Sequence, residues 1–233
     1  MASLWPYALA GVALAIPLAA SAKRSDAAVP DVPLTERRRK MRCAFSATGL
    51  GDDWLRFFEQ TAKRESDFSP RAWNKNSGER AASVRLNDRV GVVDGIDFAS
   101  GAWGFGSKGL FQFLGAVVAV RGGQLRFPRE WTNPNMGFDP GTSMAAALDY
   151  ATGLMGWQNF AGTWASLSVG WGNPSKMGNA SSLASAAKKM EDRAAKLGWP
   201  RGWAGHRVPA VRRLTQSEMA SLAHTATSYW EGC

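Results

Sequence analysis

Cysteine and histidine are both scarce in this chain of 233 residues. It contains two cysteines, Cys43 and Cys233, and two histidines, His206 and His224. No Cys-x-x-Cys pair occurs, so we expect no metal site and no small scaffold held together by several disulfides. A disulfide between the two cysteines requires an oxidising compartment and a close approach of their backbones, and the sequence leaves that pairing open.

Acidic residues are fewer than basic ones. The chain has 28 Lys and Arg against 19 Asp and Glu, which gives a net charge of +9, while 45% of its residues are hydrophobic. This composition is ordinary for a globular protein, so a wholly disordered or collagen-like chain is excluded. The positive charge favours an anionic partner, such as nucleic acid, a membrane surface or the acidic polymer of a bacterial wall. The 11 Trp residues suit stacking on sugars as well as on bases.

The first segment lacks charge altogether. Residues 1–22 are largely apolar and end in Ala-Ser-Ala, and Lys23 and Arg24 follow them. This pattern predicts a signal peptide or, because the positive charges follow the apolar run, a membrane anchor. Residues 23–44 are charge-dense and contain prolines, which predicts a basic tether. The globular domain is then expected over residues 45–233.

Local signals predict one mainly helical α+β domain. Gly51-Asp52-Asp53 and Pro70 bound a helix over residues 52–68, and Thr215 with Glu218 has the spacing of a capping box. Residues 74–107 are rich in turn-forming residues and predict an irregular or two-stranded region without a long helix. The remaining expectations are a buried helix or strand over 110–120, a helix over 139–154, another buried segment over 164–169, and helices over 181–197 and 217–229.

One carboxylate of the first predicted helix lies on its apolar side. At about 100° per residue, Glu65 falls within the stripe that contains Trp54 and Phe58. Glu59 falls with the other charged residues on the side expected to meet water. Burial and the negative end of the helix dipole both favour the protonated form of Glu65, which is the form that a general acid needs. A buried ion pair with an arginine is the alternative interpretation.

The surrounding residues carry a family resemblance. Glu65-Ser66-Asp67-Phe68-Ser69-Pro70-Arg71-Ala72 is followed by Gly106-Ser107-Lys108-Gly109-Leu110-Phe111-Gln112. In order and spacing within each half, these segments resemble the signatures of the soluble lytic transglycosylase family. The resemblance covers roughly residues 50–175 and includes Asp139-Pro140 at the start of a later helix.

The resemblance implies a lysozyme-like fold with a small β or irregular insertion beside the cleft. It also implies cleavage of the β-1,4 bond between N-acetylmuramic acid and N-acetylglucosamine in peptidoglycan. Glu65 takes the role of the acid that becomes the base, and Ser66 that of the serine that orients it. Gln112 corresponds to a glutamine of the cleft, and Gly109 and Leu110 belong to the same substrate-binding segment.

Two departures from the family pattern bear on the site. The gap between Asn74 and Gly106 is longer than in typical members, so this chain carries an insertion, which suggests a lid or a partner-binding flap. The Tyr-Asn pair that usually follows is absent, and Ser168–Pro174 stands in its place. Either Trp171 and Asn173 substitute for the pair as substrate-binding residues, or the activity is weakened.

A single glutamate suffices for a transglycosylase, because the 6-hydroxyl of the muramic acid attacks the anomeric carbon and leaves a 1,6-anhydro end. A hydrolysing muramidase needs a second carboxylate about 5 to 9 Å away. Asp88, Asp94 and Asp97 are candidates for it, although aspartates are common in turns for structural reasons.

Other features carry less weight. Trp103 and Trp171 are the tryptophans most expected to face a cleft. Gly104-x-Gly106-x-x-Gly109 mimics a dinucleotide motif but lacks the preceding strand and the later acidic residue, so no cofactor is expected. The basic cluster 37–42 is better explained as a solvated tether than as a nucleic-acid site, and no specific nucleic acid is expected as a partner.

The sequence therefore predicts a peptidoglycan lytic transglycosylase acting in the bacterial periplasm or cell envelope. Its partners would be glycan strands and the components of a secretion or conjugation machine, or of a phage virion. The alternatives are a non-catalytic adaptor that retains the scaffold, a muramidase, and a nucleic-acid-binding protein whose affinity falls steeply with salt.

Overall fold

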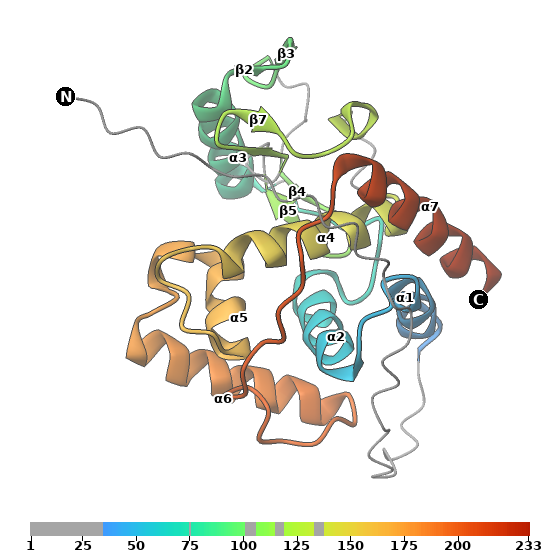
Figure 1. Cartoon of the computed structure of the whole chain (residues 1–233), viewed down its shortest axis with the longest axis vertical. Helices are drawn as coiled ribbons and strands as arrows, with labels where there is room; N and C mark the ends of the chain where they lie inside the picture. Colours follow the sequence, from blue (N-terminus) through green and yellow to red (C-terminus); the bar gives the residue numbers. More distant parts are fainter. Residues whose placement is uncertain (1–34, 75, 101–105, 115–118, 133–137) are drawn as a thin grey trace, which may run out of the picture.

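The computed structural model describes residues 35–74, 76–100, 106–114, 119–132 and 138–233. The chain is mainly helical, with short antiparallel strands gathered at one end (Figure 1). The predicted signal peptide or anchor, Trp103 and Gly104 lie outside the described residues. Among the residues described, no helix combines the length and apolar character needed to cross a bilayer.

Helices supply most of the regular structure, and the named strands all fall within residues 73–125. The α-helices are α1 (Glu36–Ser46), α2 (Asp52–Ser66), α3 (Ser77–Val90), α4 (Pro140–Met155), α5 (Trp164–Gly172), α6 (Ala180–Lys196) and α7 (Gln216–Gly232). Two short 3-10 helices, η2 (Arg129–Thr132) and η4 (Pro174–Lys176), complete the helical elements named here.

Within the described ranges, the strands are each two residues long and form three small antiparallel sheets. They are β1 (Trp73–Asn74), β2 (Val92–Val93), β3 (Ile96–Asp97), β4 (Ser107–Lys108), β5 (Phe113–Leu114), β6 (Val120–Arg121) and β7 (Gln124–Leu125). One sheet has the order β1-β4-β5, with Asn74 paired to Ser107 and Ser107 to Leu114. The other two are the hairpins β2-β3 and β6-β7.

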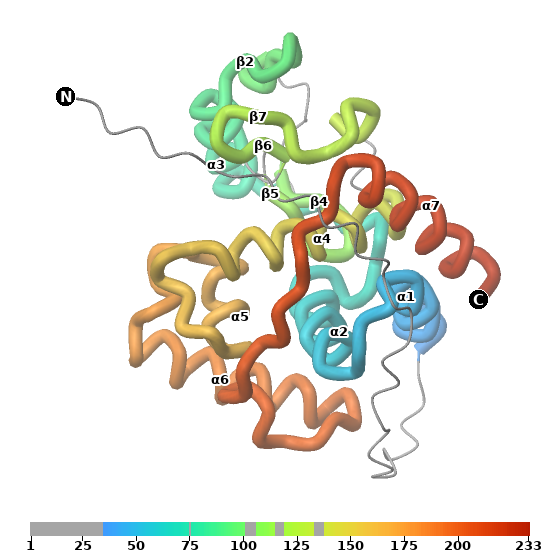
Figure 2. Tube along the Cα trace, viewed as in Figure 1, coloured from blue at the N-terminus to red at the C-terminus, as the bar shows by residue number. Residues whose placement is uncertain are grey.

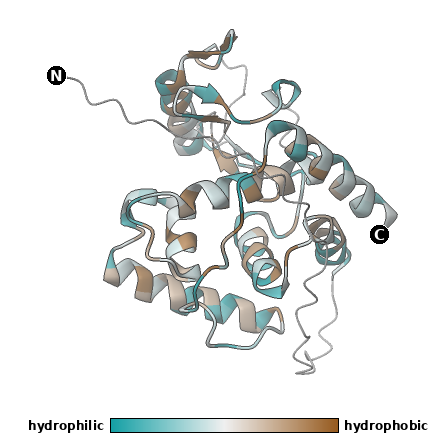
Figure 3. Ribbon diagram, in the orientation of Figure 1, coloured by the Kyte–Doolittle hydropathy of each residue, from teal (hydrophilic) through white to brown (hydrophobic). Residues whose placement is uncertain are grey.

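Helix α4 lies between α2, α5 and α6 on one side and the strand region with α3 on the other (Figures 1 and 2). Most of its residues are buried, and many are small. Gly141 allows α7 to approach closely, since a Cβ atom there would lie 2.0 Å from the carbonyl oxygen of Ala223. The more exposed helix α6 carries both hydrophilic and hydrophobic residues, as expected for a helix with one packed face (Figure 3).

Several predicted helix starts are confirmed. Asp139 caps α4 by accepting a hydrogen bond from the Thr142 amide, with Pro140 at the first position. Thr215 and Glu218 form the capping box of α7. The observed α6 and α7 correspond to the last two predicted helices, and the segment expected to be buried over 164–169 lies in helix α5.

The region before residue 45 is not a tether throughout. Helix α1 begins at Glu36 and packs against α7 and α2, so the globular part starts earlier than predicted. Arg38 and Met41 are buried. Arg38 donates two hydrogen bonds of 2.9 Å to the Glu59 carboxylate, and Arg42 donates one of 2.7 Å. This basic segment is therefore partly core, because it neutralises a buried acid.

Two expectations for the middle of the chain are also wrong. The 74–107 region contains α3, a helix of 14 residues capped by Asn76, in addition to the expected hairpin with its turn at Asp94-Gly95. Within 110–120, the described residues include a turn at Gln112 and the starts of β5 and β6 in place of one continuous element. Helix α3 was not predicted because its many small and polar residues leave only a weak apolar pattern.

The two cysteines are paired. A disulfide joins Cys43 of α1 to Cys233 after α7, with the Cα atoms 6.5 Å apart. Arg39 also donates a hydrogen bond to the carbonyl oxygen of Cys233. These contacts hold α7 beside α1, which Figure 2 shows at the same side of the molecule. The pairing that the sequence left open is thus formed.

Candidate active site

A cavity of about 850 Å³ separates the helical part of the molecule from α3 and the small strands. This volume is within the range of ligand-binding clefts. Glu65, Gln112 and Trp171, which were singled out from the sequence, all line it. Its other polar lining residues are Arg64, Asn74, Glu79, Arg89, Ser107, Arg121, Asp149, Tyr150 and Arg213.

Glu65 lies in the last turn of α2, partly exposed at the cavity wall. The exposed fraction of its side chain is 24%, so it is neither deeply buried nor directed wholly into bulk water. The neighbouring Arg64 donates a hydrogen bond of 2.6 Å from Nε to Glu65 Oε1, and a second contact comes from Nη2. The carboxylate thus faces the cavity while one of its oxygens is held by Arg64.

The buried carboxylate of α2 is Glu59 and not Glu65. Glu59 is 0% exposed and accepts hydrogen bonds from Arg38, Arg42 and, at 2.6 Å, from Trp199 Nε1. Its predicted place on the water-facing side is wrong, because α1 covers that side of the helix. Since its charge is neutralised within the fold, we assign Glu59 a structural role.

Ser66 connects the end of α2 to the turn between β4 and β5. Its hydroxyl donates a hydrogen bond of 2.8 Å to the Leu110 carbonyl oxygen. Leu110 is buried, and Gly109 has a φ of +77°, which glycine adopts without strain. Ser66, Gly109 and Leu110 are not among the cavity-lining residues. They position the turn.

Gln112 stands at the cavity end of the same turn, with a φ of +50°. Its side-chain amide donates hydrogen bonds of 3.0 Å to the carbonyl oxygens of Ala72 and Gly109. These bonds fix the turn against the segment that follows α2. The two halves of the sequence signature, which start at Glu65 and Gly106, therefore meet at one wall of the cavity.

Trp171 and Asn173 have different surroundings. Trp171 is 9% exposed and borders the cavity from an aromatic cluster, with its ring centroid 5.1 Å from that of Tyr150. Asn173 is exposed and accepts a hydrogen bond from the Ser175 amide, which caps η4. Asn173 is not among the cavity-lining residues, although its neighbours Gly172 and Pro174 are, so its role in the substrate site stays a prediction. Its side chain is used at the helix end.

Tyr150 is a cavity residue that the sequence analysis missed. Burial raises its pKa to about 12, so its hydroxyl group stays protonated and can donate a hydrogen bond at neutral pH. It lies on α4, far from the position at which a tyrosine was sought. Only the packing of α4 against α5 reveals that it lies beside Trp171.

Glu79 of α3 supplies a second carboxylate to the cavity. Its Oε2 atom accepts a hydrogen bond of 3.0 Å from the hydroxyl of Ser107. Asp149 also lines the cavity, but it pairs with Arg126 and Arg213 at 2.9 Å each. The capping spacing of Asn76 and Glu79 was the sequence signal for α3, and thus for Glu79.

The aspartates considered as second carboxylates lie elsewhere. Asp88, Asp94 and Asp97 are exposed and are not among the lining residues. Asp94 accepts a hydrogen bond from the Leu125 amide, and Asp97 accepts one from the Ser100 amide. The structural interpretation of Asp94 and Asp97 is therefore confirmed, and Glu79 replaces all three as the candidate.

The cavity carries positive charge from Arg64, Arg89, Arg121 and Arg213. Their number exceeds that of the carboxylates Glu65, Glu79 and Asp149 that line it, which favours a ligand with acidic groups. Over the described ranges, no cluster of three or more His, Cys, Asp or Glu side chains is placed to hold a metal ion. A comparison with protein-family models, curated proteins and solved structures finds no match to this chain.

Proposed function

We propose that this protein is a peptidoglycan lytic transglycosylase with a lysozyme-like fold, in which Glu65 is the acid and then the base. The observation that carries the proposal is that Glu65 and Gln112 line one cavity, although 47 positions separate them in the sequence. The match of both halves to the family signature is a sequence resemblance, and their meeting at one cavity is independent structural support.

The reaction needs one proton carrier. Glu65 donates a proton to the glycosidic oxygen as the bond from that oxygen to the anomeric carbon breaks. The 6-hydroxyl of the muramic acid then attacks the anomeric carbon, and the Glu65 carboxylate takes its proton. The products are a free 4-hydroxyl and a 1,6-anhydro end, and Glu65 is again protonated.

Other cavity residues support the binding of sugar. The Tyr150 hydroxyl is a hydrogen-bond donor at neutral pH, and the Trp171 ring lies next to the Tyr150 ring at the cavity wall. We assign to Tyr150 the part that the absent Tyr-Asn pair plays in the family. Arg64 holds Glu65 Oε1, so the proton is donated from Oε2 unless Arg64 moves away.

Glu79 favours a second candidate, a hydrolysing muramidase. Its carboxylate is held by Ser107 in the same cavity. In an inverting hydrolase the second carboxylate takes a proton from the attacking water, and in a retaining hydrolase it attacks the anomeric carbon to form a glycosyl-enzyme that water then hydrolyses with Glu65 as the base. The two candidates share Glu65 as acid and differ in their products. A transglycosylase releases anhydro ends, and a hydrolase releases reducing ends.

The test is incubation of the purified protein with peptidoglycan sacculi, followed by mass analysis of the soluble fragments. Glu65→Gln is expected to reduce release at least about 100-fold, as for the loss of a general acid. Asp67→Asn is the matched control, because Asp67 lies at the same end of α2 but pairs with Lys63 outside the cavity. Release by Glu65→Gln at the wild-type rate would contradict the proposal.

Glu79→Gln separates the two candidates. A transglycosylase keeps most of its activity and its anhydro products in this variant, whereas a muramidase loses activity together with its reducing-end products. If neither the wild type nor any variant releases fragments while all of them are folded, the chain is a non-catalytic adaptor that uses the cavity for binding.

We further propose that the protein acts in the cell envelope, locally opening the wall for a secretion machine or a phage particle. The Cys43–Cys233 disulfide supports an oxidising compartment. The net charge of +9 suits contact with an acidic polymer.

A further inference from the structure

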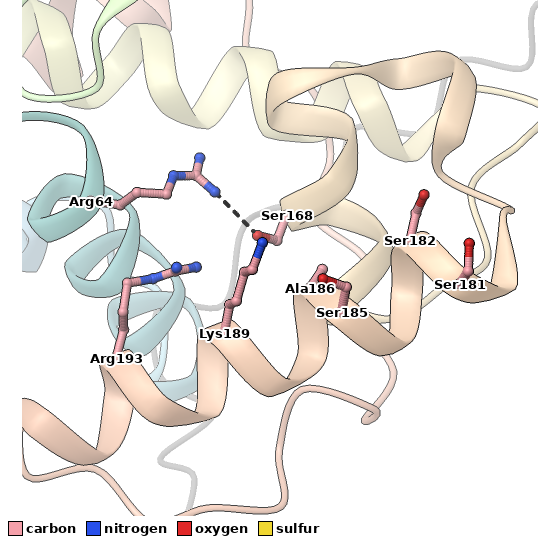
Figure 4. Close-up of a pocket in the computed structure, with 8 residues that line it drawn as sticks. All are labelled: Arg64, Ser168, Ser181, Ser182, Ser185, Ala186, Lys189 and Arg193. Carbon is pink, nitrogen blue, oxygen red and sulfur yellow. Dashed lines mark hydrogen bonds between the residues drawn. The ribbon is translucent and has the colours of Figure 1, made fainter.

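A second pocket lies beside the proposed active site, between the end of α2, α5 and one face of α6. Its volume is about 540 Å³. Arg64 comes from α2, Ser168 from α5, and the other residues that line it from α6. In Figure 4, Arg64, Lys189 and Arg193 extend toward the same space, and Ser168 accepts a hydrogen bond of 3.4 Å from Arg64 Nη1. Three cationic groups thus converge there.

The charge of this pocket is not balanced by its own lining. In the part of the chain that the structure describes, no carboxylate is among the lining residues, which are Arg64, Ser168, Ser181, Ser182, Ser185, Ala186, Lys189 and Arg193. Like charges brought together in this way repel one another, and an anion would relieve the repulsion. Burial and, to a smaller extent, the charge of Arg64 lower the pKa of Arg193, while the charge of Glu65 raises it. The negative charge nearest to this pocket is therefore Glu65, which pairs with Arg64 outside the lining.

The remaining side chains suit an oxyanion. Four serines line the pocket, and a serine hydroxyl can donate a hydrogen bond to a carboxylate or phosphate oxygen. Ser181 already donates to Asn179 Oδ1, which leaves Ser168, Ser182 and Ser185 as the candidate donors. The Nε atom of Arg193 is held by Gln60 at 3.0 Å, which fixes the direction of its guanidinium group. Two guanidinium groups held by neighbouring side chains, the exposed ammonium group of Lys189 and the serine hydroxyls together suit a small acidic group better than an apolar one.

We propose that this pocket binds an oxyanion, and that the oxyanion is a carboxylate on the peptides of the polymer that occupies the neighbouring cavity. Arg64 supports the connection, because it lines both spaces. Its Nε contacts Glu65, and its Nη1 faces Ser168 at the second pocket. A polymer that lies along the cavity therefore has a cationic site for its acidic branches within reach. Only the identity of the polymer rests on the proposed function.

The first experiment titrates the full-length protein with sodium phosphate as an oxyanion probe, followed by calorimetry or by NMR of the arginine side chains. Lys189→Gln is expected to weaken phosphate binding about tenfold, the effect of losing one charge-assisted contact. Lys188→Gln is the matched control, because Lys188 is also exposed on α6 and does not line the pocket. It is expected to bind within about twofold of the wild type. No saturable binding by the wild type, or equal weakening by both variants, would overturn the site.

The second experiment identifies the source of the anion. Soluble glycan fragments are compared with and without their peptides, using Glu65→Gln so that no cleavage intervenes. If the polymer supplies the carboxylate, removing the peptides weakens binding about tenfold, and Lys189→Gln abolishes that difference. Equal binding of the two fragments overturns the assignment to the polymer, and saturable phosphate binding alone then identifies a site for free anions. Since neither readout requires turnover, its failure is distinguishable from a failure of Glu65 to act.

Discussion

Substitution of Glu59 by glutamine is expected to lower the free energy of unfolding by about 3 to 5 kcal/mol, the cost of breaking a buried ion pair. Glu59 is 0% exposed and accepts hydrogen bonds from Arg38, Arg42 and Trp199. Glutamine preserves the shape of the side chain but removes the charge that neutralises two arginines. For a domain of about 200 residues, each kcal/mol shifts Tm by about 2 to 4 °C, so a fall of roughly 6 to 20 °C is expected.

The assay is denaturant unfolding with the disulfide intact, followed by circular dichroism and tryptophan fluorescence. Glu65→Gln serves as the comparison within the same helix, and its unfolding free energy is expected to stay within about 0.5 kcal/mol of the wild type, as for surface substitutions. A Glu59→Gln variant as stable as the wild type would refute the structural role of the ion pairs. A Glu65→Gln variant that loses several kcal/mol would show that the proposed catalytic glutamate holds the fold together.

Two further predictions concern stability. Burial lowers the pKa of Lys108 to about 8 from 10.5, so the unfolded chain binds more protons between these values and the unfolding free energy rises with pH across that window, by at most about 3 kcal/mol. Lys108→Met is expected to flatten this rise in pH-dependent denaturation curves, and an unchanged slope would contradict the argument. Reduction of Cys43–Cys233, which lie 190 positions apart, is expected to cost up to about 5 kcal/mol by chain entropy. Matched unfolding curves with and without reductant measure it, and overlapping curves would show that the cross-link is not stabilising.

The helices with strong local signals were predictable from the sequence. Asp139-Pro140 and Thr215 with Glu218 mark helix starts through hydrogen bonds that the first turn makes to itself. These signals act within four residues, so no tertiary information is needed to interpret them. The same logic applied to Asn76 and Glu79 would have revealed α3, but the polar composition of the surrounding segment favoured turns.

The burial of charged residues was not predictable in the same way. The pattern of α2 separates an apolar stripe from a charged side, and it predicted that Glu59 faces water. The structure places α1 on that side, and hydrogen bonds from Arg38 and Arg42 offset the cost of burying the Glu59 carboxylate. A helical projection records which residues share a face, but only the fold determines which face is covered.

Some residues of the candidate site were also predictable from the sequence, and others were not. Glu65, Gln112 and Trp171 were identified from the sequence, the first two through a motif whose spacing reflects one wall of the cavity. Glu79 and Tyr150 come from α3 and α4, which contribute other walls, and no spacing rule links them to that motif. Asn173 was assigned by its place near Trp171, yet the end of α5 turns its side chain toward η4.

Arg64 lines both pockets, so an anion bound in one of them would affect Glu65 in the other. A general acid must hold a proton, and Glu65 Oε1 accepts a hydrogen bond from Arg64 in the chain without ligand. An anion seated between Lys189 and Arg193 would compete with Glu65 for the same guanidinium group, because Arg64 also lines that pocket. Withdrawal of Arg64 would leave both Glu65 oxygens available for proton transfer. If both proposals hold, the acidic branches of the polymer would hold the strand and would also prepare Glu65 for proton transfer.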